Sequence, residues 1–319
     1  MINISVIIIT YRRPHGLIRV LEGLGRQQCQ DPSRQFRMTA IVVDNDSKKS
    51  AEASVELFKL SSQLDVQYIS ELAQGIPIAR NKGLAAVSAN AEFLCFIDDD
   101  EWPGETWIDE LLKTQRATGA DCVLGAVIPV YPDLAPRWLV NSRVFDSWQF
   151  ADQEVLTEAA SNNVLISHAF IRKTKLRFDE RMRMTGGSDF LFFQQAVSLG
   201  MRIVWSAGAP VFEEVPMSRM KLRWLVQRQF RLGNTFSVSE RLVGTKLGLT
   251  KLVIIGFVRM CSGFAMLPAL LFSPYYGMRA VMHLLRGAGT VAGAFGHAHQ
   301  EYSPTGVALD RSAHASKLN

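Results

Sequence analysis

The sequence predicts an α/β fold with a mostly parallel sheet and flanking helices. Apolar, β-branched runs recur along the first 130 residues, and each is followed by a segment with helical features. The chain has 319 residues, of which 48% are hydrophobic and 20% charged, so it can bury a large core. This composition excludes disordered, collagen-like and disulfide-scaffold proteins. The alternation of strands and helices places a ligand site beyond the carboxyl ends of the strands.

The individual elements follow from apolar runs and breaker residues. Strands are expected at residues 4–9, 37–43, 66–69, 92–97 and 121–128. Helices are expected at residues 14–28, 52–60, 76–87 and 103–117. Pro14 and Pro77 suit first helical turns, where the missing N–H costs nothing. Beyond Val130 prolines loosen the pattern, and only a strand at 163–167 and a helix at 188–199 are expected before the basic region.

The basic residues of the chain gather near its C-terminal end. Residues 215–300 contain eleven Lys and Arg and one acidic residue, Glu240, although the whole chain has a formal charge of only +5. Residues 219–236 combine apolar and basic faces, and residues 252–272 are long enough to cross a bilayer but are interrupted by Arg259 and Pro268. Cations beside apolar residues favour an anionic membrane surface and argue against nucleic acid. A buried helical hairpin or a dimer interface is the alternative.

Two features of the sequence predict the compartment. Its four cysteines are well separated and lack CxxC spacing, which indicates reduced thiols. The apolar N-terminal run has no preceding basic segment and no cleavage site, so a first strand is expected rather than a signal peptide. The protein is therefore expected in the cytoplasm, at the cytoplasmic face of the inner membrane.

Polar residues follow three of the predicted strands: Thr10 with Tyr11, then Asp44, then the run Asp98 to Asp100. Because parallel strands end at the same edge of a sheet, these residues are expected to line one crevice. Three consecutive carboxylates repel one another unless a cation joins them, and Mg²⁺ and Mn²⁺ prefer carboxylate oxygens. The alternative is a solvated turn in which Asp98 or Asp100 caps the next helix.

Arg80 and Asp189 are further candidates. Arg80 lies on a helix that begins at the same crevice, and its guanidinium can bind a diphosphate or a base carbonyl. Taken alone, it is more simply a surface arginine paired with a carboxylate. Asp189 begins a helix after Gly186 and Gly187, where the helix dipole alone would explain a carboxylate and a catalytic base is the other interpretation. Dinucleotide-binding and P-loop motifs are absent from the sequence.

These segments together resemble family 2 glycosyltransferases, which have the GT-A fold of nucleotide-diphospho-sugar transferases. The resemblance covers about residues 4–234. It is carried, in this order, by Val6 to Arg13, Val42 to Ser47, Ala79 to Gly83, Phe96 to Asp100 and Gly186 to Asp189. The triple aspartate resembles the DXD element of the family.

The resemblance implies a role for each matched residue. Those implied to bind the nucleotide are Thr10, Tyr11, Arg13, Asp44, Arg80, Asp98 and Asp99. Asp98 and Asp100 would hold Mn²⁺ or Mg²⁺, and Asp189 would be the catalytic base. The implied reaction is an inverting transfer of one sugar, expected from a UDP-sugar, to a hydroxyl in cell-surface polysaccharide synthesis. A glycan or a polyprenyl-linked oligosaccharide is the expected acceptor.

Two departures from the family pattern qualify these implications. Ser188 stands before Asp189, where the family usually has Glu, and the QxxRW motif of processive synthases is incomplete near Arg228. Transfer of a single sugar is therefore favoured over polymerisation. Trp224, Arg228 and Arg231 are candidates for contacts with the diphosphate, the acceptor or lipid headgroups. A catalytically silent membrane-associated scaffold and a nucleotidyltransferase that releases pyrophosphate are the rival functions.

Three regions are expected along the chain. Residues 1–235 form the catalytic region, with a nucleotide-binding half at about 1–130 and an acceptor half at about 131–235. Residues 236–296 form a hydrophobic, basic helical region that associates with the membrane, and residues 297–319 form a polar tail.

Overall fold

The computed structural model describes residues 1–147, 149–183, 186–243 and 248–297. The chain divides into two compact units. The first, called the sheet unit, contains Met1–Pro129, Ser147–Arg183 and Ser188–Glu214. The second, called the helical unit, contains Val130–Asp146, Met184–Gly187 and Val215–Asn319.

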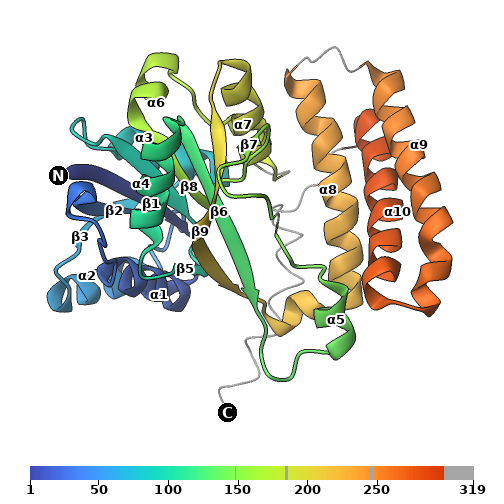
Figure 1. The fold of residues 1–319 in the computed structure, drawn as a ribbon, viewed down its shortest axis with the longest axis horizontal. Coiled ribbons are helices and arrows are strands. Elements are labelled where there is room, and N and C mark those ends of the chain that lie inside the picture. The colour runs from blue at the N-terminus through green and yellow to red at the C-terminus, as the bar shows by residue number, and fades with distance from the viewer. Residues whose placement is uncertain (148, 184–185, 244–247, 298–319) are drawn as a thin grey trace. The chain divides into compact units, whose positions relative to one another are not determined.

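The described part of the sheet unit is built on a sheet of nine strands (Figure 1). Their order is β3-β2-β1-β4-β8-β6-β9-β5, and β7 pairs with β9. The bounds are β1 Ile2–Thr10, β2 Phe36–Asp44, β3 Asp65–Ser70, β4 Phe93–Ile97, β5 Glu101–Pro103, β6 Cys122–Val130, β7 Val155–Leu156, β8 Asn163–Ser167 and β9 Ile203–Glu214. Strands β3, β2, β1 and β4 are parallel, whereas β8 is antiparallel to β4 and β6. The expected α/β fold is confirmed, with an antiparallel part added beyond β4.

Helices cover both faces of this sheet. Successive residues of β1 point to opposite faces, so Val6 and Ile8 join one apolar core and Ile7 joins the other. The first core is covered by α1 (Pro14–Gly25), α2 (Glu52–Ser61) and α4 (Trp107–Thr118). The second is covered by α3 (Ile76–Ala86), α6 (His168–Thr174) and α7 (Ser188–Ser198). The parallel strands are thus buried on both sides, as their uninterrupted apolar runs predict.

The structure corrects the expected start of α4. A helix is predicted from Pro103, but α4 begins at Trp107, because residues 101–103 form β5 and pair with β9. Strand β9 itself is not predicted from the sequence. Its middle contains Ala207, Gly208 and Pro210, which break the apolar alternation that identifies a strand.

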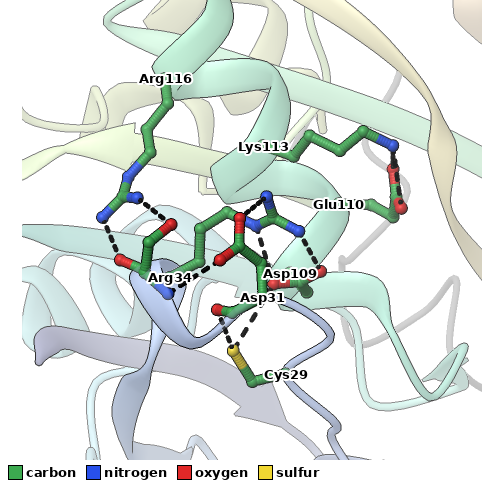
Figure 2. A network of polar contacts seen from close by, with 8 residues as sticks. Cys29, Asp31, Arg34, Asp109, Glu110, Lys113 and Arg116 are labelled. Atoms are coloured by element: carbon green, nitrogen blue, oxygen red, sulfur yellow. Dashed lines mark hydrogen bonds and ion pairs between the residues drawn. The ribbon is translucent and has the colours of Figure 1, made fainter.

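A buried ion pair ties α4 to the segment before β2 (Figure 2). The Nε and Nη2 atoms of Arg34 donate hydrogen bonds to the two carboxylate oxygens of Asp109, at 2.9 and 2.8 Å. Nη1 of Arg34 donates to Asp31 Oδ2 at 2.8 Å. Asp109 is fully buried, so Arg34 compensates a charge that has no contact with water.

Replacing Arg34 with alanine is expected to lower the free energy of unfolding by about 3 kcal/mol, because it leaves the buried Asp109 carboxylate without its partner. Urea unfolding followed by circular dichroism measures this difference. Lys113→Ala is the matched control, since it breaks an exposed pair with Glu110 on the same helix and is expected to cost at most about 0.5 kcal/mol. Equal losses in the two variants would contradict the role assigned to Arg34.

The described helices of the helical unit are α5 (Arg137–Ser142), α8 (Leu222–Val243), α9 (Leu249–Met266) and α10 (Pro274–Ala294). α10 packs between α8 and α9 (Figure 1). Glycines allow this close approach: a Cβ added at Gly233 or at Gly289 would lie 1.9 Å from a carbonyl oxygen of the facing helix. α8 runs through residue 235, so the expected boundary at this position falls within a helix. The polar tail lies, apart from its first residue, outside the described residues.

Candidate active site

The three aspartates Asp98 to Asp100, called the acidic loop, form a turn fixed by the residue that follows them. The backbone N–H of Glu101 donates to the Asp98 carbonyl at 3.2 Å, and the Asp98 N–H donates to Glu101 Oε2 at 3.1 Å. The side-chain amide of Asn162 donates to the other carboxylate oxygen of Glu101 at 2.9 Å. The loop does not cap α4, because β5 intervenes, so the solvated-cap alternative is wrong.

Glu101 was missed by the sequence analysis. It is 1% exposed, and burial raises the pKa of its carboxyl well above the usual value, with further contributions from Asp98 and Glu213. Its position immediately after three aspartates was the available signal. Glu101 holds the acidic loop in place through its hydrogen bonds with Asp98.

The ends of β1 and β4 meet at the acidic loop, as the parallel arrangement predicts. Thr10 Oγ1 donates a hydrogen bond to Asp99 Oδ2 at 2.8 Å. Nη1 of Arg13 lies 3.1 Å from Asp99 Oδ1 and 2.8 Å from Asp100 Oδ2. A Cβ added at Gly16 would lie 2.3 Å from the Asp99 carbonyl oxygen, so glycine allows the first turn of α1 to approach the loop.

Arg80 reaches the same loop from α3. Its Nη2 lies 3.6 Å from Asp98 Oδ1, and its Nη1 donates to Ser188 Oγ at 3.4 Å. The guanidinium carbon lies 5.3 Å from the centre of the Phe178 ring. Arg80 is 6% exposed, so the interpretation of a surface arginine is wrong, although its pairing with a carboxylate is confirmed.

The electrostatic environment of Asp98 reflects this convergence. Its side chain is 37% exposed, and the partial burial of its carboxyl raises the pKa above the usual value. Arg80 opposes this change, whereas the charges of Asp100, Asp99 and Asp189 add to it. The contact of Ser188 with Arg80 places the start of α7, where Asp189 lies, beside these charges. The site gathers negative charge that a cation or a cationic side chain must balance.

Asp189 lies in the first turn of α7, and its Oδ1 accepts a hydrogen bond from the Phe190 N–H at 2.9 Å. The preceding Gly186 and Gly187 have φ angles of 74° and 78°, which glycine adopts without strain. This turn directs the chain into α7 directly before Asp189. The helix dipole therefore stabilises the carboxylate of Asp189, and the same carboxylate lies beside the acidic loop, so the structural and the catalytic interpretations are compatible.

Asp44 and Tyr11 occupy the neighbouring strand ends. The carboxylate of Asp44 is fully buried and accepts hydrogen bonds from the backbone N–H groups of Asp46 and Ala51 and from the Tyr68 hydroxyl. The hydroxyl of Tyr11 accepts a hydrogen bond from Gln74 at 2.9 Å. Asp44 thus organises the loop after β2, and its contact with a base or ribose stays a prediction.

The donor chemistry of the acidic loop suits a hard divalent cation. Among the described residues, no group of three His, Cys, Asp or Glu side chains is arranged to hold a metal ion by itself. Mg²⁺ commonly binds through one or two carboxylates and completes its coordination with water and substrate phosphates. The loop therefore fits a metal whose remaining ligands come from a phosphorylated substrate, not a closed protein cage.

The remaining candidates lie on α8 in the helical unit. Trp224 stacks on Phe145 with ring centres 5.9 Å apart, and the guanidinium carbon of Arg228 lies 5.1 Å from the Trp224 ring centre. Arg231 follows Arg228 by one turn of the helix. These residues form a cationic and aromatic cluster within their own unit, and their contact with a diphosphate or an acceptor stays a prediction.

Known proteins match both the sequence and the fold. The model of the family described as glycosyl transferase family 2 matches residues 5–178. The chain is 32% identical over 302 residues to the succinoglycan biosynthesis protein ExoM of Rhizobium meliloti, covering 92% of this chain and 94% of that protein. Over 125 residues it is 31% identical to the glycosyltransferase GlyA of Streptococcus pneumoniae, covering 39% of this chain and 16% of that protein.

Solved structures with a similar fold include TarS residues 1–349 of S. aureus, with a TM-score of 0.53 and 17% identity over 90% of both chains. The same protein in complex with UDP-GlcNAc has a TM-score of 0.51 and 15% identity, again over 90% of both chains. At these identities the likeness shows a shared fold.

Proposed function

The chain belongs to glycosyltransferase family 2 and is therefore a glycosyltransferase, and we propose that it transfers one sugar from a nucleotide-diphosphate sugar to a hydroxyl of a glycan or lipid-linked acceptor. The observation that carries this proposal is the convergence of Thr10, Arg13, Arg80 and Asp189 on the acidic loop. A relative named for succinoglycan biosynthesis supports a role in polysaccharide synthesis, and the UDP-GlcNAc complex of TarS supports a UDP-sugar donor.

The proposed reaction requires charge stabilisation at the leaving group and removal of a proton from the acceptor. Asp98 and Asp100 would hold Mn²⁺ or Mg²⁺, which supplies electrostatic stabilisation of the departing diphosphate. Arg80 adds a buried, permanent positive charge at the same edge of the sheet. Asp189 accepts the proton of the acceptor hydroxyl, which attacks the anomeric carbon from the face opposite the leaving group and inverts it. Ser188 contacts Arg80 where the family usually has a carboxylate.

A panel of nucleotide sugars incubated with the full chain and Mn²⁺ tests this function. The expected result is slow hydrolysis of one donor to free sugar and nucleoside diphosphate. Release of pyrophosphate from a sugar phosphate and a nucleoside triphosphate would instead support a nucleotidyltransferase. If no donor turned over, the catalytically silent scaffold would be favoured. Chromatography of the nucleotide products separates these three outcomes.

We also propose that α9 attaches the enzyme to the cytoplasmic face of an anionic inner membrane. Within the described residues, one stretch, Leu249–Leu271, is long and apolar enough to cross a membrane, with a hydropathy of 1.8, and only 17% of its apolar window is buried. Its inner side packs on α10 at Gly256 and Gly263, while Phe257 and Phe264 are exposed. This exposure argues against a buried hairpin and supports contact of the outer side with lipid.

Replacing both Phe257 and Phe264 with aspartate is expected to weaken binding to vesicles that contain anionic lipid by at least about tenfold, because each buried aromatic side chain contributes about 2 kcal/mol. Co-sedimentation with vesicles measures the change. Leu60→Asp is the matched control, since Leu60 is an exposed apolar residue of α2 and its replacement is expected to leave vesicle binding unchanged. Unchanged binding of the double variant would rule out α9 as the lipid contact.

A further inference from the structure

We propose that the Arg13 guanidinium pairs with the acidic loop in the absence of ligands and must leave Asp100 before a divalent metal ion binds there. As a result, the metal ion and the donor diphosphate bind cooperatively. This inference rests on the proposed function, because it takes the donor and the metal from it. In addition to lining the nucleotide pocket, Arg13 makes the affinity for the metal ion depend on whether the nucleotide is bound.

One nitrogen atom of Arg13 bridges two members of the acidic loop. Nη1 lies 3.1 Å from Asp99 Oδ1 and 2.8 Å from Asp100 Oδ2. The second oxygen of Asp99 accepts the Thr10 hydroxyl at 2.8 Å, so Asp99 is held on both oxygens. A metal ion that coordinates Asp100 through Oδ2 therefore competes directly with the Arg13 guanidinium for the same atom.

The charge of Arg13 is permanent, but its position is not enclosed. An arginine guanidinium stays protonated in proteins whether or not it is paired with a carboxylate. The side chain is 50% exposed, and it makes no cap hydrogen bond to the helix that begins at Pro14. The guanidinium can therefore leave Asp100 without losing its charge and without opening the core.

The balance of charge explains why metal and diphosphate should bind together. Arg13 and Arg80 already face the three aspartates, so a divalent ion alone adds positive charge beside two cations. A diphosphate brings the opposing negative charge and offers oxygens to the displaced guanidinium, which binds phosphate well. Binding of either ligand thus favours the other, which is a positive coupling between the two sites.

Arg12, which precedes Arg13 in the segment between β1 and α1, provides an internal comparison. Its backbone has a φ angle of 58°, in the left-handed region that residues other than glycine seldom adopt. Its Nε lies 3.2 Å from Asp46 Oδ2, so its guanidinium pairs with the loop after β2. Replacing Arg12 therefore removes a neighbouring positive charge but leaves the contact between Arg13 and Asp100 in place.

The test measures Mn²⁺ binding by electron paramagnetic resonance, with and without UDP, in the full chain and its variants. Arg13→Gln is expected to bind Mn²⁺ alone at least about fivefold more tightly than the unmodified chain, and UDP is expected to strengthen Mn²⁺ binding less in this variant. Arg13→Met removes the same charge with a different side chain and is expected to give the same result. Arg12→Gln is expected to stay within about twofold of the unmodified chain.

Two results would overturn the inference, and they are distinguishable. If both Arg13 variants fold, as judged by circular dichroism, and bind Mn²⁺ alone no more tightly than the unmodified chain, Arg13 does not compete with the metal, and the proposed function stands. If no form of the protein binds Mn²⁺ even with UDP, the metal role in the proposed function fails, and this inference fails with it. Equal gains in Arg12→Gln and Arg13→Gln would also overturn it, because only net charge would then matter.

Discussion

Asp189→Asn is expected to lower kcat for sugar transfer by at least about a thousandfold, because an amide cannot accept the proton of the acceptor hydroxyl. The substitution keeps the size of the side chain, and the asparagine oxygen can still accept the Phe190 N–H at the start of α7. Donor binding should therefore stay within about twofold of the unmodified enzyme, since the change removes an interaction made in the transition state.

The measurement is transfer of labelled sugar to a lipid or glycan fraction, together with the affinity for UDP by calorimetry. Glu105→Gln is the control, because Glu105 is an exposed carboxylate between β5 and α4 that pairs with Gln28. It should leave both kcat and affinity unchanged. If the Asp189 variant kept more than about a tenth of the activity, another group would have to remove the proton, and Asp189 would be left as a helix-terminal carboxylate.

The sequence predicted the part of the site that follows from strand direction. Thr10 and Asp99 are 89 positions apart, yet both follow parallel neighbours in the sheet, so their contact at 2.8 Å could be anticipated from the apolar runs alone. Arg13 was a candidate only through the resemblance to the family, and its contacts with Asp99 and Asp100 were not anticipated. The local sequence pattern was sufficient to predict the position of a residue wherever that residue directly follows a regular strand.

Contacts that depend on packing between distant segments could not be predicted in this way. Arg80 alone suggests a surface residue, and it is buried because Phe178 and Ser188 enclose it from segments about a hundred positions later. The pair of Arg34 and Asp109 is equally non-local, and neither residue belongs to a recognisable motif. Their partners are set by the tertiary fold, which overrides the local preference of a charged residue for water.

Asp100→Ala is expected to lower kcat by about a hundredfold to a thousandfold and to weaken Mn²⁺ binding in the presence of UDP, because it removes one of the two carboxylates proposed to hold the metal ion. Asp99 is held by Thr10 and Arg13, and Asp98 faces Arg80. The side chains of Asp98 and Asp100 are 37% and 24% exposed, against 9% for Asp99, so these two carboxylates have more access to an incoming ion. Chelation of the unmodified enzyme should reduce its activity to the level of this variant.

Comparing the Asp100→Ala variant with the chelated unmodified enzyme distinguishes loss of the metal ion from loss of a negative charge. Glu105→Ala removes a negative charge in the same unit and should stay within about twofold of the unmodified enzyme at every Mn²⁺ concentration. Added Mn²⁺ should restore the chelated enzyme fully and the Asp100 variant only in part, since the variant has lost a ligand. If thorough chelation left turnover unchanged, Arg13 and Arg80 would have to stabilise the leaving diphosphate without a metal, and the residual activity of Asp100→Ala would then approach that of the unmodified enzyme.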